Sequence, residues 1–161
     1  MKRLLVSLTQ SNGKGLTQMA EYVSNPVQLV EQDQNVLLTD SIPCTKGYVI
    51  HRNGSGILTL RGIVKNPCAA FARYHVAFNG NIAIPTTGTA GEISLALAID
   101  GEAIQTSRAR ITPTATDAYF NVTSVANITV PAGCCFTISI ENTSDQSINV
   151  QNANLTIDRT A

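Results

Sequence analysis

The sequence is short of charge and of aromatic side chains. Of its 161 residues only 14% are charged and 5% are aromatic, and tryptophan is absent. An ordinary soluble domain carries about 25% charged residues. The 11 basic residues balance the 11 acidic ones, so the formal net charge is zero. We therefore expect neither nucleic acid nor a membrane among the partners of this chain, because both attract clustered positive charge.

Long hydrophobic runs are also missing. The amino-terminal sequence offers only the stretch from Leu4 to Leu8, which is shorter than the roughly 7 to 15 apolar residues of a secretory signal. No run reaches the roughly 18 apolar residues of a membrane-spanning helix. We therefore expect no signal peptide and synthesis in the cytoplasm, where the four cysteines would be thiols.

What the sequence does contain is a period-two alternation of apolar and polar residues from about residue 27 onward. In GEISLALAIDGEAI the alternation leads into Asp100-Gly101, which predicts a β-hairpin with a tight turn. A second hairpin is predicted around Asn53-Gly54, and Asn79-Gly80 predicts a further turn between RYHVAF and NIAIP. Many short alternating strands, separated by turn residues at intervals of roughly ten, indicate an all-β sandwich or barrel.

One segment has the spacing of a helix. In KGLTQMAEYVSN the apolar residues Leu16, Met19, Ala20 and Val23 follow the i, i+3, i+4, i+7 pattern, which Asn25-Pro26 ends. We therefore divide the chain into an N-terminal arm of a short strand and a short helix at 1–26, and a β domain at 27–161. The arm could pack on its own sandwich, or it could dock onto a neighbouring subunit or a larger scaffold.

Two adjacent cysteines interrupt the late sequence NITVPAGCCFTISIEN. Neighbours in a strand point to opposite faces. Cys134 then belongs to the apolar row that continues through Phe136 and Ile138, whereas Cys135 belongs to the polar row. We expect Cys134 to be a small core residue and Cys135 to lie on a side that faces solvent or another subunit. The pair cannot converge on one metal ion, and a disulfide between them would strain a regular strand.

The other residues with chemical potential do not form a recognisable site. His51 and His75 lie in predicted strands, without the convergent ligands or the nucleophile that a metal site or a catalytic triad needs. Cys44 and Cys68 each follow a proline. They are either small buried hydrophobic residues or partners in a bridge that forms in an oxidising environment. We find no close carboxylate pair and no phosphate-binding loop, and we expect no catalytic, cofactor or metal site and no enzymatic activity.

The β domain resembles the trimeric jelly roll shared by tumour necrosis factor and the globular heads of complement and collagen-like proteins. The likeness is carried by GEISLALAIDGEAI, by VTSVANITVPAGCCFTISIENTS with its VPAG turn between hydrophobic strands, and by INVQNANLTIDR, which is like the family's closing strand. The resemblance implies a jelly-roll β-sandwich that forms a homotrimer. The collagen-like stalk of many family members is missing. The aromatic residues that could line a trimer axis are Tyr48, Phe71, Tyr74, Phe78, Tyr119, Phe120 and Phe136.

A narrower resemblance extends from GYVIHRNGSGILTLRG through the rest of the chain. This region looks like small structural proteins of phages and prophages of gut Firmicutes. It implies a non-enzymatic virion protein, made in the host cytoplasm, that decorates a capsid or forms part of a head fibre or tail tip beside partners such as the major capsid protein. A surface poor in charge suits a protein that functions inside an assembly.

Two other functions remain open at the level of sequence. The first is a carbohydrate- or receptor-binding module that recognises a host surface glycan, for which Tyr48 and Tyr119 are the candidate aromatic platforms. The second is a spore-surface protein of the same fold, which also needs no signal peptide.

Overall fold

The computed structural model describes residues 18–42, 47–62 and 71–160, and these are almost entirely β-strand. No α-helix occurs within these ranges, and no helix there is long and apolar enough to cross a membrane. The strands are β1 (Gln18–Ser24), β2 (Gln28–Val30), β3 (Asp40–Ile42), β4 (Val49–His51), β5 (Leu58–Arg61), β6 (Phe71–Ala83), β7 (Ile93–Ile99), β8 (Glu102–Ala103), β9 (Ala109–Ile111), β10 (Phe120–Pro131), β11 (Cys135–Asn142) and β12 (Ile148–Arg159), with a short 3-10 helix at Gln105–Ser107.

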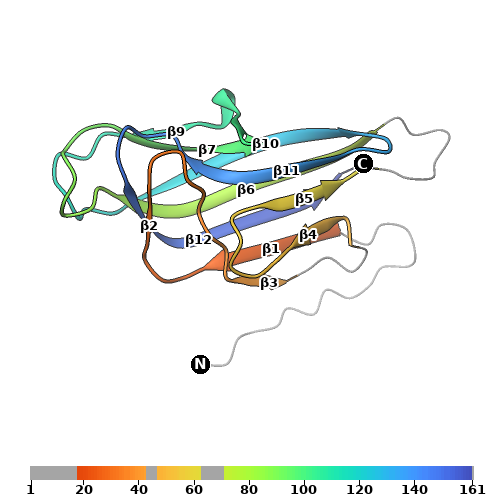
Figure 1. The fold of residues 1–161 in the computed structure, drawn as a ribbon, viewed down its shortest axis with the longest axis horizontal. Helices are drawn as coiled ribbons and strands as arrows, with labels where there is room; N and C mark the ends of the chain where they lie inside the picture. The colour runs from red at the N-terminus through yellow and green to blue at the C-terminus, as the bar shows by residue number, and fades with distance from the viewer. Residues whose placement is uncertain (1–17, 43–46, 63–70, 161) are drawn as a thin grey trace.

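The strands form two six-stranded antiparallel sheets that lie face to face (Figure 1). Sheet A has the order β10-β6-β12-β1-β3, and β2 also pairs with β12; sheet B has the order β4-β5-β11-β7-β8, and β9 also pairs with β7. Strands that are distant in the sequence are therefore neighbours in both sheets. This arrangement is a jelly-roll β-sandwich, as the resemblance of the sequence implied.

One hydrophobic core fills the space between the sheets. Along β6 the even-numbered residues from Ala72 to Ile82 are buried, while the odd-numbered residues from Phe71 to Asn81 are exposed or half-buried. The same alternation appears in β10 and β12. Since these three long strands each have an apolar row facing the other sheet, their period-two pattern in the sequence translates directly into the core.

Two of the predicted hairpins are confirmed. β7 and β8 pair across Asp100-Gly101, and both turn residues have positive φ angles, of 51° and 81°. This is the conformation that a two-residue hairpin turn requires. β4 and β5 pair around Asn53-Gly54, with Val49 opposite Leu60. Asp and Gly tolerate the left-handed conformation better than other residues, so the local sequence is sufficient to specify the turn.

The turn predicted at Asn79-Gly80 is wrong, because β6 continues through both residues as a single strand. A Cβ atom at position 80 would lie 2.8 Å from the Phe78 ring and 3.6 Å from the Ala153 Cα atom. Next to this position the register of β12 against β6 shifts between Gln151 and Asn154, as in a β-bulge. Gly80 is therefore required for close packing within a strand rather than for a turn.

The predicted helix in the N-terminal arm is also wrong, because Gln18–Ser24 is the strand β1. β1 pairs with β12 over its whole length and with β3 on its other side. Ala20 and Tyr22 point into the core, so the segment also satisfies a period of two. The two sheet neighbours decide between the two periodicities, since strand propensity depends strongly on tertiary context. Residues 1–17, the rest of the predicted arm, lie outside the described residues.

Candidate interaction face

The outer face of sheet A is the most extensive candidate for a functional surface. Its edge is β10, a strand of twelve residues without a single charged side chain. The outward row of β10 consists of Asn121, Thr123, Val125, Asn127 and Thr129, all of which are exposed. Natural proteins protect long exposed edges with charged residues, bulges or covering segments. Apart from Pro131 at its end, β10 has none of the sequence devices that discourage edge pairing.

Several polar side chains on this face already have partners. Asn121 donates to the side-chain oxygen of Asn81 at 3.1 Å, and the Nδ1 atom of His75 lies 2.9 Å from the side-chain oxygen of Asn127. Asn154 donates to the Glu21 carboxylate at 2.7 Å. These hydrogen bonds connect neighbouring strands and do not depend on water. A partner that covers this face therefore leaves fewer polar groups unsatisfied than it would on a face whose polar groups bond only to water.

Small side chains of neighbouring strands lie opposite one another on this face. Val125 of β10 lies opposite Ala77 of β6, which in turn lies opposite Thr156 of β12. Val125 is 42% exposed. No function was predicted for these positions from the sequence. The available signal was weak, since it consisted only of an apolar residue in the polar phase of the strand VTSVANITV.

Charge is unevenly distributed across the face. Arg73 and His75 project from β6, whereas Asp158 on β12 and Glu21 on β1 lie farther from the β10 edge, and Asp40 follows on β3. The half containing β10 and β6 therefore carries the basic groups, and the half containing β1 and β3 carries acidic ones. This separation makes the two halves electrostatically complementary to one another in different copies of the chain.

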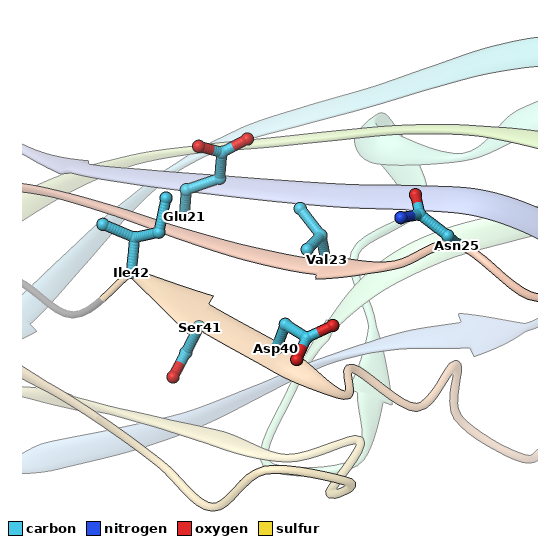
Figure 2. A pocket seen from close by; sticks show the side chains of 6 residues that line it. All are labelled: Glu21, Val23, Asn25, Asp40, Ser41 and Ile42. Atoms are coloured by element: carbon cyan, nitrogen blue, oxygen red, sulfur yellow. The ribbon is translucent and has the colours of Figure 1, made fainter. Parts of the chain in front are cut away.

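A hollow of 330 Å³ lies over the acidic half, between β1 and β3. In Figure 2 the side chains of Glu21 and Ile42 stand on the same side of the two strands, and Ser41 points the other way. The lining residues are Glu21, Val23, Asn25, Asp40, Ser41 and Ile42. The lining contains two carboxylates and no cationic side chain, so the hollow belongs to the acidic half of the outer face.

His51 and His75 lie in different sheets. His51 is half-buried in sheet B; its Nε2 atom lies 2.9 Å from the Ser55 carbonyl oxygen, and its ring packs edge-on against Tyr22. Its Nδ1 atom is buried without a hydrogen-bond partner. His75 is exposed on sheet A. Among the residues that the structure describes, no three His, Cys, Asp or Glu side chains gather closely enough to hold a metal ion.

The adjacent cysteines differ in part from the prediction. Cys135 is exposed on the outer face of sheet B, and Phe136, Ile138 and Ile140 point toward the core as expected. Cys134 is exposed as well, so its predicted burial is wrong. It precedes β11 and lies in the turn in which its backbone N–H donates to the Pro131 carbonyl at 3.2 Å. The alternation of apolar residues in the sequence extends to Cys134, but the hydrophobic core ends before this turn. Cys44 and Cys68 lie outside the described residues.

The aromatic residues offer few free platforms. Tyr74 and Phe78 are buried in the core between the two sheets. The Tyr48 ring is covered by the Arg159 guanidinium, 3.8 Å from the ring centroid, and Tyr119 is half-buried. Among the described aromatic residues, Phe71 and Phe120 are 40% and 46% exposed, and the Arg73 guanidinium lies over the Phe71 ring, 5.1 Å from its centroid. Glycan binding through Tyr48 or Tyr119 therefore stays a prediction from the sequence.

Comparison with known proteins reveals the fold but no family. No family model and no curated protein matches the chain. Among solved structures, the globular domain of a zebrafish complement 1qA protein is similar with a TM-score of 0.56 at 12% identity, covering 91% of this chain and 98% of that one. Eiger TNF from S. frugiperda is similar with a TM-score of 0.53 at 13% identity, covering 90% and 93%. The chain therefore has a jelly-roll fold like those of complement and TNF domains.

Proposed function

We propose that this protein is a non-enzymatic module that functions by associating with further copies of itself through the outer face of sheet A. The observation that carries the proposal is the edge strand β10, which is long and uncharged and is the terminal strand of its sheet. Such an edge is a ready template for association with another chain unless it is covered. A neighbouring subunit is the simplest cover.

The polar pairs on the face lower the cost of covering it. A buried donor or acceptor without a partner costs about 1 to 3 kcal/mol. Asn121, Asn127 and Asn154 already exchange hydrogen bonds with neighbouring strands. Burial against a partner then gains the apolar contacts of Val125 and Ala77 with a smaller desolvation penalty.

We propose that the copies form a homotrimer. If the basic half with Arg73 contacts the acidic half with Glu21 and Asp40 of the next copy, the two contacting surfaces differ. An interface between two different surfaces generates a ring when the rotation closes. The jelly-roll fold and the sequence resemblance to trimeric jelly rolls support a ring of three copies.

Val125→Glu tests the interface, with Ile50→Glu as its matched control. Both positions hold a β-branched aliphatic residue in a strand, and they are 42% and 50% exposed, but Ile50 lies on sheet B. A carboxylate at position 125 would be buried against the acidic half of the next copy, and like charges at an interface cost several kcal/mol. Multi-angle light scattering under reducing conditions should detect a trimer for the natural chain and Ile50→Glu, but a monomer for Val125→Glu. A monomeric natural chain at high concentration would remove the proposal.

Within this function we propose a structural role in a bacteriophage particle. The support is compositional and comes from the likeness of the sequence to phage and prophage structural proteins, together with the low charge expected of a surface buried in an assembly. Induction of a lysogen that carries the gene, followed by sedimentation and mass spectrometry, provides the test. We expect the chain in the particle fraction with the major capsid protein. Recovery only among unassembled proteins would contradict the role, and recovery from spore coats would favour the spore-surface alternative.

A further inference from the structure

The turn that connects β10 of sheet A to β11 of sheet B exposes two thiols that the proposed interface does not use. The turn lies at one end of the sandwich, where the two long strands are joined (Figure 1). Cys134 and Cys135 are both exposed there. Exposure is the first requirement for thiol reactivity. The two side chains differ in direction, because only Cys135 projects from the outer face of sheet B.

The backbone opposes closure of a disulfide between these two residues. The carbonyl oxygen of Cys134, which belongs to the peptide bond that joins the pair, accepts a hydrogen bond from the Gly62 N–H at 2.9 Å. Position 62 is so close to this strand that a Cβ atom there would lie 2.7 Å from the same oxygen. Twisting that peptide bond to bring the sulfur atoms together would break the contact and the start of β11. Cys134 and Cys135 are the only cysteines in the part of the chain that the structure describes, so no third cysteine there can pair with either of them, and a second copy of the chain supplies a partner.

The surroundings of Cys135 are self-complementary in charge. Arg61 of β5 lies directly opposite Cys135 and is exposed on the same face. On the other side of β11, the exposed Asp100 carboxylate accepts hydrogen bonds from the N–H and the hydroxyl of Thr137, each at 2.9 Å. A two-fold axis that runs parallel to β11, above its outer face, exchanges the two sides of this strand. Two copies that meet there would place each Arg61 near the Asp100 of the other copy and bring the two Cys135 side chains together.

We propose that Cys135 is a cross-linking site at which two copies of this chain become joined by a Cys135–Cys135 disulfide when they meet a low-molecular-weight disulfide such as oxidised glutathione. The thiolate of one Cys135 attacks the small disulfide, forms a mixed disulfide and releases one small thiol. The second Cys135 thiolate attacks the protein sulfur of that mixed disulfide and releases the second small thiol. The two protein thiols are oxidised, the small disulfide is reduced, and the two cysteine protons leave on the two released thiols.

Cys134 supplies the matched control. It is also an exposed thiol and is the neighbouring residue, but its side chain does not project from the outer face of sheet B. The natural chain, Cys134→Ser, Cys135→Ser and Arg61→Glu are incubated with oxidised glutathione, resolved on non-reducing gels and mapped by mass spectrometry of the linked peptides. We expect reducible dimers for the natural chain and Cys134→Ser, and a loss of at least about tenfold for Cys135→Ser. Arg61→Glu should slow dimer formation several-fold at low salt, with a smaller effect at high salt, because added ions screen exposed charges.

Several results would overturn the site. The first is that Cys135→Ser forms as much disulfide-linked dimer as the natural chain. The second is that the Cys135 peptide is found only as a glutathione adduct or linked to another cysteine of its own chain. Val125→Glu separates this proposal from the self-association through sheet A. It should still form the disulfide, because position 125 is on the other sheet.

Discussion

The two sheets fill the same core with different side chains. The largest fully buried residues of sheet A include the aromatic residues Tyr22, Tyr74 and Phe78, whereas those of sheet B are aliphatic, such as Leu95 and Leu97. The rings of sheet A are long enough to reach toward the opposite sheet. Aromatic side chains bury large areas and, in tyrosine, carry a polar group that seeks a partner. Sheet A therefore contributes larger buried side chains to the core than sheet B does, and the contribution of the two sheets to stability is unequal.

Tyr74 shows how this difference holds the sheets together. Its hydroxyl donates to the carbonyl oxygen of Arg61, at the end of β5, and lies 3.4 Å from the carbonyl oxygen of Tyr48. A side chain of sheet A thus binds the backbone of sheet B. The outer faces differ as well: sheet A has the uncharged edge β10, whereas sheet B carries Arg61 and Asp100 near its exposed cysteine. A face suited to extensive association and a face suited to a single covalent contact lie on opposite sides of one core.

Truncation of a buried ring in sheet A should have the largest effect on folding. Phe78→Ala removes a side chain with 0% exposure from the centre of β6. We expect a loss of about 3 to 5 kcal/mol in the free energy of unfolding, measured by urea titration. Phe136→Ala, in sheet B, is the comparison, because this ring is only partly buried. Its cost should be smaller, and an equal or greater cost would contradict the unequal division between the sheets.

A buried amide in sheet B connects the two sheets at one end and should give an intermediate effect. Asn142 donates to the carbonyl oxygens of Val30 at 3.0 Å and Gln146 at 2.9 Å, and its oxygen accepts from the Ser144 N–H at 2.9 Å. Asn142→Ala leaves these groups without that partner, and we expect a loss of about 1 to 3 kcal/mol by the same titration. Asn127→Ala removes an exposed amide of sheet A and should change stability much less. Indistinguishable losses would indicate that water replaces the Asn142 contacts.

A carboxylate in sheet B should give the smallest effect. Burial, and then the nearby Asp33 carboxylate, raise the pKa of Glu141 above its ordinary value of 4.5. The folded state then holds this proton more tightly than the unfolded state does. Stability from this group is greatest below pH 4.5 and declines as the pH rises through the folded pKa, so the ionised carboxylate carries a penalty above that pKa.

Glu141→Gln should therefore raise the melting temperature at pH 7 and have little effect at pH 4. Solvent screening limits the gain to less than about 1 kcal/mol. Glu21→Gln, in sheet A, is the control, because Glu21 accepts a hydrogen bond from Asn154. We expect no gain from this change. A Glu141→Gln benefit that is equal at both pH values would rule out the ionised carboxylate as the cause.

Local sequence predicted some turns and failed at others that look the same. Asp100-Gly101 forms a turn with two positive φ angles, whereas Asn79-Gly80 lies within a continuous strand. Both pairs are typical of hairpin turns. The difference comes from residues far along the chain, since β6 is flanked by β10 and β12 on both sides of the glycine. Seven residues of pairing with β12 similarly make a strand of β1, which has helical spacing of its apolar residues.

The direction and exposure of Cys135 were predicted correctly, and the burial of Cys134 was predicted incorrectly. Alternation along CCFTISIEN placed Cys135 on the outer face, and the register of β11 agrees. Alternation cannot indicate where the core ends, however, and Cys134 lies in the turn beyond it. The candidate interaction face required still more, because Val125 and Ala77 became neighbours only when β10 and β6 paired.

The sequence by itself determined the all-β class, the inward rows of most strands and the low charge of the surface, because each of these depends on composition or on a period of two residues. The tertiary structure decided which strands pair, whether β1 is a helix or a strand, why Gly80 is needed and which side chains share the outer face of sheet A. These features depend on contacts between distant segments, such as the bond from Asn142 to Val30 across 112 residues. A local pattern specifies which way a side chain points, but only the pairing of strands specifies what lies beside it.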